Sequence, residues 1–310
     1  MIVGSNGYEF EWIDEWARIP DTESGRTNGR THGVEVTEDG RVVVFNQADP
    51  AVLCFDQNGT LLESWGSRFH GAHGLTLVAE HGETYCWLTD QDSGEVVKTT
   101  LGGETVARLD EPEHAAYEDG TYVPTWVAVH ERSTGDRDIW VADGYGESLI
   151  HRFDESGGYQ DSFDGTTGAG RFDCPHAIFF DSRPSGTGPE LYVADRGNAR
   201  VQVYRPDGSF ARSFGTDVLT SPCAFDTYQD FLVVPELFAR VTLFDGDDGV
   251  ITHLGANQEI VDHDDWPNVP EEALAPGRFN SPHDAACDDE GHLYVVEWIK
   301  GGRITKLRRV

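Results

Sequence analysis

Residues 175–214, PHAIFFDSRPSGTGPELYVADRGNARVQVYRPDGSFARSF, contain four short apolar segments separated by sequences rich in Gly, Pro, Asp and Ser. The segments are 177–180, 191–193, 199–204 and 210–214. Short runs of Val, Ile, Phe and Tyr bounded by turn residues are typical of β-strands joined as hairpins. The stretch therefore predicts one sheet of four antiparallel strands.

The same pattern recurs along the whole chain, at intervals of 41 to 60 residues. The first strand of each copy begins at Gly33, Gly74, Trp126, Ala177, Ala224 and Asp284. The second apolar run of each copy covers 42–45, 85–88, 139–141, 191–193, 231–234 and 293–296. Repeats of four short strands are the signature of propeller blades. The sequence therefore predicts an all-β fold, a six-bladed β-propeller that occupies residues 1–310 as a single domain.

The last blade needs a strand from elsewhere in the chain, because the sixth copy ends at residues 304–310, its third strand. Residues 8–12 alternate between apolar and polar side chains and belong to no copy. Since proteins avoid unpaired sheet edges, we expect this N-terminal strand to complete the last blade as its outer strand. The longest departure from the repeat is the acidic stretch 258–278, with Trp266, which is either a lid over one face or a solvated insertion.

The charge of the chain restricts its partners. The formal net charge is −32, which argues against nucleic acid and anionic membranes and leaves a small-molecule substrate as the expected partner. The 23 basic residues include only three lysines, Lys98, Lys300 and Lys306. Abundant carboxylates with almost no lysine predict a halophilic protein, in which salt screens the self-repulsion.

Cysteine spacing and the N-terminal residues bear on the compartment. The five cysteines are far apart and form no C-x-x-C pair, which predicts reduced thiols and no disulfide framework. The first residues lack the basic start and apolar run of a signal peptide, so we expect a cytoplasmic protein, with a trimmed export signal as the alternative. The oligomeric state is taken as monomeric by default.

Histidines recur at one position of the repeat. The residues at the start of the inner strands are His32, His73, Thr125, His176, Cys223 and His283, so four of the 12 histidines share this position. Blades two, four and six carry His73, His176 and His283, and alternate blades of a six-bladed propeller are about 120° apart. Three imidazoles with a fourth position left open are the ligand set of a catalytic zinc site.

Two questions about these histidines stay open at this point. The ligand type favours zinc over iron, manganese or nickel without excluding them, and a histidine-rich rim without metal is the structural alternative. His32 is a fourth ligand, an acid–base group or only a hydrogen-bonding residue at the rim.

Loops after the second strands supply further candidate residues. Tyr145 is a candidate general base, because a nearby metal cation lowers the pKa of a phenol. Arg196 is a candidate anchor for a substrate carboxylate through its planar guanidinium. Asp143 and Asp195 are predicted to be structural, accepting hydrogen bonds from backbone N–H groups in the turns.

These residues give the chain a resemblance to a known family. The resemblance rests on Ala72-His-Gly-Leu75, Trp140-Val-Ala-Asp-Gly-Tyr145, the stretch 193–200, Pro175-His176 and Pro282-His283-Asp284. At these positions the chain resembles the NHL-repeat propellers and, among them, the catalytic core of peptidyl-α-hydroxyglycine α-amidating lyase.

The resemblance implies a site and a reaction. It places zinc on His73, His176 and His283, makes Tyr145 the base and puts Arg196 in the lining of the site. It also implies a structural calcium bound by the carboxylate of Asp284 and the carbonyl of Leu75. The implied reaction breaks an N–C bond of a carbinolamide and releases an amide and glyoxylate.

The chain departs from the family at several positions. An arginine expected in blade one aligns near residues 45–47, where there is none, and the methionine before the last Pro-His is Ser281. The family's disulfide cysteines have no counterparts, and His32 replaces a small residue. Our leading hypothesis is a zinc-dependent lyase that breaks a C–N bond in a small polar or carboxylate-bearing substrate. The alternatives are a non-catalytic NHL propeller that acts as a binding scaffold, and a metal-dependent hydrolase.

Overall fold

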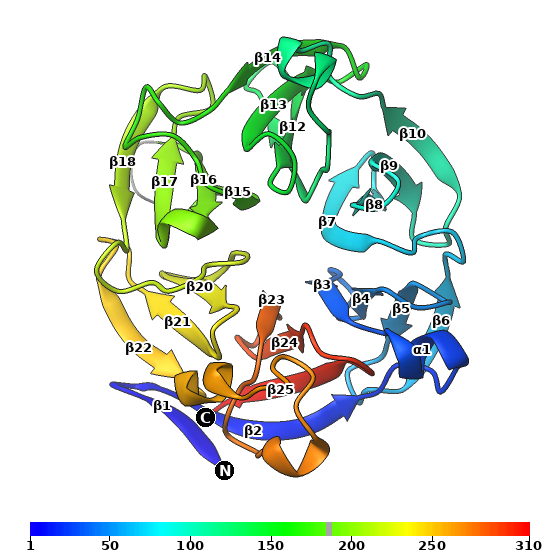
Figure 1. Cartoon of the computed structure of the whole chain (residues 1–310), viewed down its shortest axis with the longest axis vertical. Coiled ribbons are helices and arrows are strands. Elements are labelled where there is room, and N and C mark those ends of the chain that lie inside the picture. Colours follow the sequence, from blue (N-terminus) through cyan, green and yellow to red (C-terminus); the bar gives the residue numbers. More distant parts are fainter. Residues whose placement is uncertain (184–187) are drawn as a thin grey trace. The chain divides into compact units, whose positions relative to one another are not determined.

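The computed structural model describes residues 1–183 and 188–310, whose strands form six antiparallel sheets. The fold is a six-bladed β-propeller, as the repeat predicts (Figure 1). The chain divides into a central unit, Gly71–Pro222, and a terminal unit made of Met1–His70 and Cys223–Val310. Each unit contributes three sheets and is described by itself; the prediction of a single domain stays a prediction.

The central unit contains blades two, three and four. Their strands are β7 (Ala72–Glu80), β8 (Glu83–Asp90), β9 (Glu95–Thr100), β10 (Thr105–Leu109), β11 (Trp126–Glu131), β12 (Arg137–Asp143), β13 (Leu149–Asp154), β14 (Tyr159–Phe163), β15 (Pro175–Asp181), β16 (Glu190–Asp195), β17 (Arg200–Tyr204) and β18 (Phe210–Phe214). Short 3-10 helices lie at Ala115–Glu118 and Arg196–Asn198. Alternate residues of blades two and three, among them Trp87, Val127 and Phe153, bury their side chains in one apolar cluster.

The terminal unit contains blades one, five and six. Their strands are β3 (Thr31–Val36), β4 (Val42–Asn46), β5 (Val52–Phe55), β6 (Leu61–Trp65), β19 (Asp226–Tyr228), β20 (Phe231–Glu236), β21 (Arg240–Phe244), β22 (Val250–Leu254), β23 (Pro282–Cys287), β24 (Leu293–Glu297) and β25 (Arg303–Arg309), joined by β1 (Ile2–Ser5) and β2 (Tyr8–Ala17). The five-residue helix α1 (Glu23–Thr27) begins where the Thr22 side chain accepts a hydrogen bond from the Gly25 backbone N–H.

The N-terminal strand completes blade six, as predicted, but it is not the outer strand. β2 pairs with β25, with Trp12 opposite Leu307, and β1 then pairs with β2 to give a five-stranded sheet. The prediction missed β1, whose four residues include Gly4 and show no clear alternation. The pairing of β2 with β25 joins the N-terminal and C-terminal segments of the chain, and the burial of Phe10 and Trp12 in the core cluster stabilises this pairing.

The insertion 258–278 has local structure of its own. It contains short 3-10 helices at Gln258–Asp262 and Glu271–Ala273. The Trp266 indole N–H donates to the Asn280 carbonyl at 3.1 Å, and its ring centroid lies 6.5 Å from that of Trp298. The insertion is therefore anchored to the segment that enters β23, and whether it acts as a lid stays open.

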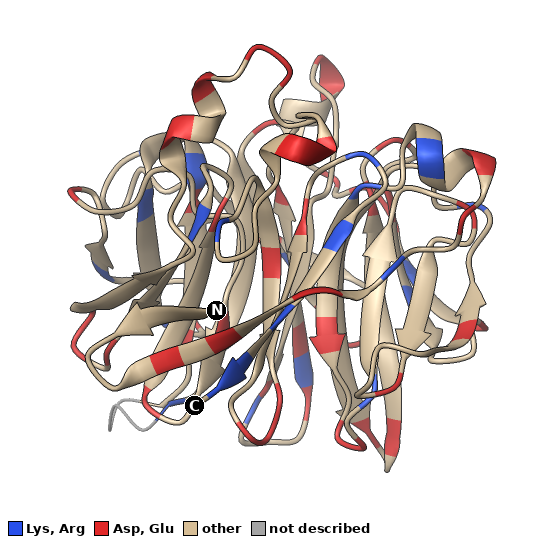
Figure 2. Ribbon diagram, turned by 90° about the horizontal axis from the view of Figure 1, so that it is seen from below, with Lys and Arg blue, Asp and Glu red and all other residues tan. Residues whose placement is uncertain are grey.

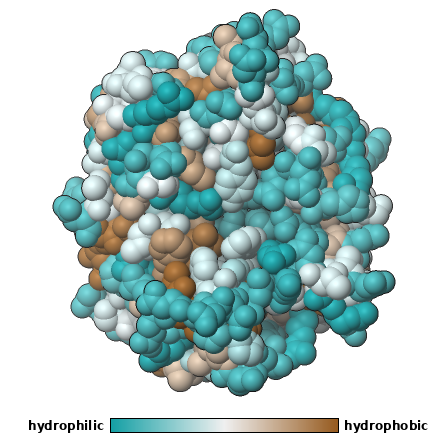
Figure 3. All heavy atoms as spheres, in the orientation of Figure 1, coloured by the Kyte–Doolittle hydropathy of each residue, from teal (hydrophilic) through white to brown (hydrophobic). Residues whose placement is uncertain are grey.

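The described surface is predominantly polar. Acidic residues greatly outnumber basic ones along the ribbon in Figure 2, and most atoms visible in Figure 3 belong to hydrophilic or neutral residues. None of the five cysteines, all of which lie in the described residues, forms a disulfide. Within residues 1–183 and 188–310, no helix has both the length and the apolar character needed to cross a membrane. Compartment, partners and salt adaptation stay predictions.

Candidate active site

All four histidines of the repeat position lie where the register of an inner strand is interrupted. The residue before each histidine pairs with the last residue of the second strand, and regular pairing resumes only after the histidine. The pairs before the interruption are Thr31 with Asn46, Ala72 with Asp90, Pro175 with Asp195 and Pro282 with Glu297. β11 and β19, whose blades carry Thr125 and Cys223 at this position, pair in regular register. Bulges of this kind re-aim a side chain beside an active site, and sequence reasoning did not predict them.

Acidic residues at the ends of second strands hold the segments that enter the inner strands. Each carboxylate accepts a hydrogen bond from the backbone N–H of such a segment. The pairs are Asp90 with Gly71 (2.9 Å), Asp143 with Val123 (2.7 Å), Asp195 with Asp173 (2.8 Å), and Glu297 with Asn280 (2.5 Å) and Ser281 (3.0 Å). This confirms the structural role predicted for Asp143 and Asp195.

In the central unit, two histidines converge on one hydroxyl. The Tyr145 hydroxyl oxygen lies 3.1 Å from Nε2 of His73 and 3.0 Å from Nε2 of His176. The ring centroids of the two histidines are 4.7 Å apart, and both side chains are fully buried. The structure thus brings together three of the residues predicted for the site.

The orientation of His73 is set by the backbone of the next blade. Its Nδ1 lies 2.8 Å from the carbonyl oxygen of Thr125, which can only accept a hydrogen bond. In the neutral imidazole Nδ1 therefore carries the proton, and Nε2 presents its lone pair toward Tyr145. A fixed Nδ1–H is the usual support of a histidine that binds a metal through Nε2.

Arg196 completes the group in the central unit. Its Nη1 donates to the Tyr145 hydroxyl oxygen at 3.2 Å, and its guanidinium carbon lies 5.2 Å from the centre of the tyrosine ring. The Tyr145 side chain is 38% exposed, so a solute can reach the ring beside which the guanidinium lies. The arrangement places two imidazole nitrogens and a guanidinium around the phenol oxygen of Tyr145.

In the terminal unit, His32 and His283 form a second pair. Their ring centroids are 4.4 Å apart with an interplanar angle of 69°, and both side chains are 2% exposed. Nδ1 of His283 donates to the carbonyl oxygen of His32 at 2.8 Å, which leaves Nε2 of His283 as the acceptor nitrogen. His283 therefore has the same supported tautomer as His73.

Of the two residues predicted to bind calcium, Asp284 belongs to the terminal unit and Leu75 to the central unit. Asp284, in β23, is buried and accepts hydrogen bonds from the backbone N–H groups of Val34 and Ala285, each at 2.8 Å. Burial raises the pKa of the Asp284 carboxyl well above its usual range. Leu75 is buried in β7. The calcium site stays a prediction.

The position near the missing blade-one arginine has a structural occupant. The Asn46 side-chain amide donates to the carbonyl oxygens of Pro50 and Ala51, so this residue closes a turn. Arg30, which sequence reasoning missed, lies two residues before His32, and its guanidinium carbon is 5.4 Å from the centre of the Trp298 ring. The one available signal was its place just before a blade-start histidine.

A buried polar chain supports the turn that carries Tyr145. The Tyr117 hydroxyl donates to Asp143 at 2.7 Å and lies 2.7 Å from Nε2 of His151, whose Nδ1 lies 2.6 Å from the Ser162 hydroxyl. Asp143 also accepts from the backbone N–H of Glu147 at 2.6 Å. His151 thus proves to be a hydrogen-bonded core residue, which agrees with its position off the repeat.

His151 makes stability depend on pH. Burial, with a smaller contribution from His114, lowers its pKa to about 3, whereas an unfolded histidine titrates near 6.5. Below pH 6.5 the unfolded chain therefore binds the proton first, and stability falls as the pH falls. Between pH 7 and pH 5 we expect the protonation of this group to lower the free energy of unfolding by on the order of 2 kcal/mol.

Denaturant unfolding at both pH values should show this loss reduced in His151→Gln and unchanged in His70→Gln, which alters an exposed histidine. Equal pH dependence in wild type and His151→Gln would contradict the assignment.

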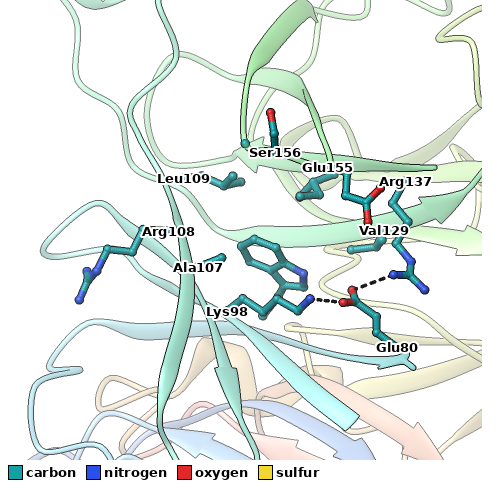
Figure 4. Close-up of a pocket in the computed structure, with 12 residues that line it drawn as sticks. Glu80, Lys98, Ala107, Arg108, Leu109, Val129, Arg137, Glu155 and Ser156 are labelled. Carbon is teal, nitrogen blue, oxygen red and sulfur yellow. Dashed lines mark hydrogen bonds and ion pairs between the residues drawn. The ribbon is translucent and has the colours of Figure 1, made fainter. Parts of the chain in front are cut away.

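A cavity of about 150 Å³ in the central unit is separate from the candidate site (Figure 4). Its lining includes Lys98 and Arg137, which both pair with Glu80. Glu80 ends β7, seven residues beyond His73, roughly 23 Å along an extended strand.

The fold and the blade-start histidines define the class of protein: the chain is a six-bladed β-propeller that resembles the NHL-repeat propellers and the amidating-lyase core. No protein-family model matches the chain.

Curated relatives agree with this class. Human NHL repeat-containing protein 3 is 27% identical over 216 residues, which cover 64% of this chain and 59% of the human protein. Rat peptidylglycine alpha-amidating monooxygenase is 24% identical over 265 residues, covering 80% of this chain and 25% of the rat protein. The Xenopus laevis form B of that enzyme is 27% identical over 266 residues, 80% of this chain and 27% of that protein. The chain thus matches about six tenths of the human NHL protein and about a quarter of the amidating enzymes.

Solved structures share the fold. A streptogramin B lyase structure aligns with a TM-score of 0.61 and 13% identity, covering 99% of this chain and all of the other. Virginiamycin B lyase from Staphylococcus aureus with quinupristin aligns with a TM-score of 0.60 and 12% identity, covering 97% of this chain and all of the other. At this identity the likeness concerns the fold alone.

Proposed function

We infer that this protein is a metal-dependent lyase that breaks a C–N bond in a small polar, carboxylate-bearing substrate. The observation that carries the proposal is the convergence of His73 and His176, through their Nε2 atoms, on the hydroxyl of Tyr145. The matched amidating monooxygenases support the type of reaction.

The donor set fits a divalent transition metal. His73 and His283 each have Nδ1 bound to a backbone carbonyl, which makes Nε2 the basic nitrogen with which each would bind a metal. We propose His73, His176 and His283 as the ligands, with zinc favoured by the all-imidazole set and the open fourth position. When bound, the metal would act as a Lewis acid toward a substrate oxygen. Asp284 is the carboxylate proposed for a structural calcium.

Tyr145 and Arg196 supply the proton transfer and the substrate contact. Arg196 donates to the phenolic oxygen and so stabilises the deprotonated form, which can take the proton of a carbinolamide hydroxyl. As the carbonyl forms, the C–N bond breaks, and the leaving nitrogen takes a proton to become an amide. The guanidinium has further donors with which it can hold the substrate carboxylate.

The test compares metal-loaded wild type with Tyr145→Phe on an α-hydroxyglycine amide. We expect wild type to release glyoxylate and the variant to be slower by about 10² to 10⁴-fold, the usual contribution of a positioned acid or base. The metal content should stay the same in both, because the change removes only the hydroxyl. Glyoxylate can be measured by derivatisation and chromatography.

Two outcomes would overturn the proposal. Wild type that takes up no transition metal would remove its basis and favour a binding scaffold. Wild type that binds metal and hydrolyses esters or lactones, but yields no glyoxylate, would show a hydrolase instead.

A further inference from the structure

We propose that His32 binds the same metal ion as His283, so that the protein adds a fourth imidazole ligand to the three of the proposed function. The inference rests on that proposed function and extends it to the identity of the metal. It concerns a residue for which the sequence left three roles open.

The geometry of the pair in the terminal unit is the first support. A ring nitrogen of His32 and one of His283 lie within 4.8 Å of each other, and their rings meet edge to face at 4.4 Å between centroids. Two ligands on one ion, each about 2.1 Å from it, lie at most about 4.2 Å apart. The two nitrogens therefore lie near the separation that a shared metal ion requires, and a small movement of the rings brings both to one metal.

The orientation of His32 is the second support. Its Nδ1 lies 3.3 Å from the carbonyl oxygen of Arg30, which can only accept, so this nitrogen is the one that carries the proton. Nε2 is then the basic nitrogen, as in His283. The same type of backbone carbonyl supports both rings of the pair.

The backbone is the third support. His32 lies at the register interruption of β3, as His283 does in β23. The carbonyl oxygen of His32 is also the acceptor for Nδ1 of His283. His32 thus holds the neighbouring ligand with its backbone while its own imidazole lies beside the ring of that ligand.

A fourth imidazole changes which metal the site suits. Four ligands complete a tetrahedral zinc site and leave no position for substrate. Iron(II), manganese(II), cobalt(II) and nickel(II) also accept imidazole nitrogen and take five or six ligands. Since imidazoles are neutral, the ion keeps its full positive charge for a bound carboxylate. With His32 as a ligand, we therefore expect a metal of higher coordination number in the native protein, in place of the zinc that a site of three histidines favours.

The experiment counts imidazole ligands in wild type, His32→Ala and His70→Ala, each loaded with cobalt(II). His70 is exposed, so its removal is a matched loss of one histidine. X-ray absorption should find four imidazoles in wild type and in His70→Ala and three in His32→Ala. Competition with a chelator should show at least about tenfold weaker binding in His32→Ala, since even the loss of an outer partner costs 10–100-fold. His32→Gln serves as a second variant if the alanine chain does not fold.

The outcomes separate this inference from the proposed function. Three imidazoles in wild type, with unchanged spectrum and affinity in His32→Ala, would overturn the role of His32 and leave the metal-dependent lyase intact. Wild type without bound cobalt would overturn the proposed function and, with it, the fourth ligand.

Discussion

His73→Ala is expected to weaken metal binding strongly while the propeller still folds. The imidazole contributes one of the proposed ligand nitrogens, and the Thr125 carbonyl that orients it belongs to the backbone and stays in place. Because losing an outer hydrogen-bond partner alone weakens metal binding 10–100-fold, removal of the ligand should cost more than about 100-fold. The measurement is metal content after dialysis against a weak chelator, by mass spectrometry.

Stability gives an independent readout of the same prediction. A metal present at 100 times its Kd stabilises the native state by about 2.7 kcal/mol. Denaturant unfolding with and without metal should show this gain in wild type and in the exposed-histidine control His70→Ala, and none in His73→Ala. An equal gain in His73→Ala would mean that the metal binds elsewhere, and the proposed ligand set would be wrong.

The blades could be predicted because each copy of the repeat carries its own local signal. Inner strands such as β15 are apolar runs, and third strands such as β17 alternate between apolar and polar residues. Each strand can therefore be recognised from the hydrophobic pattern of its own sequence. β1 and α1 were missed for the opposite reason. They have four and five residues, and β1 is held by contacts such as that of Ser5 with Thr252, which no local pattern encodes.

The candidate site was predictable in its residues and not in its contacts. The repeat alone selects His73 and His176, because both begin inner strands. Their convergence on Tyr145 joins residues 72 and 31 positions apart, and the partner of Nδ1 in His73 is a backbone carbonyl that any residue could supply. The register interruptions that turn the histidines likewise depend on pairing between strands, which a single strand sequence does not specify.

Glu297→Ala should cause the largest loss of stability among simple substitutions at the site. The carboxylate is fully buried, accepts from the backbone N–H groups of Asn280 and Ser281 through one oxygen, and from Arg303 at 3.0 Å through the other. Truncation leaves two buried donors unsatisfied and takes one of two carboxylate partners from Arg303, which keeps Asp14. Breaking a buried pair in this way costs about 3–5 kcal/mol.

An exposed ion pair of the same unit provides the control. Arg278 and Glu259 are 55% and 80% exposed, so Arg278→Ala should change the free energy of unfolding by less than about 1 kcal/mol. Urea unfolding of the two variants measures the difference. A loss in Glu297→Ala no larger than that of the control would contradict the account. Since Glu297 also holds the segment that enters β23, the variant should bind metal more weakly through His283, an effect that Arg278→Ala should not share.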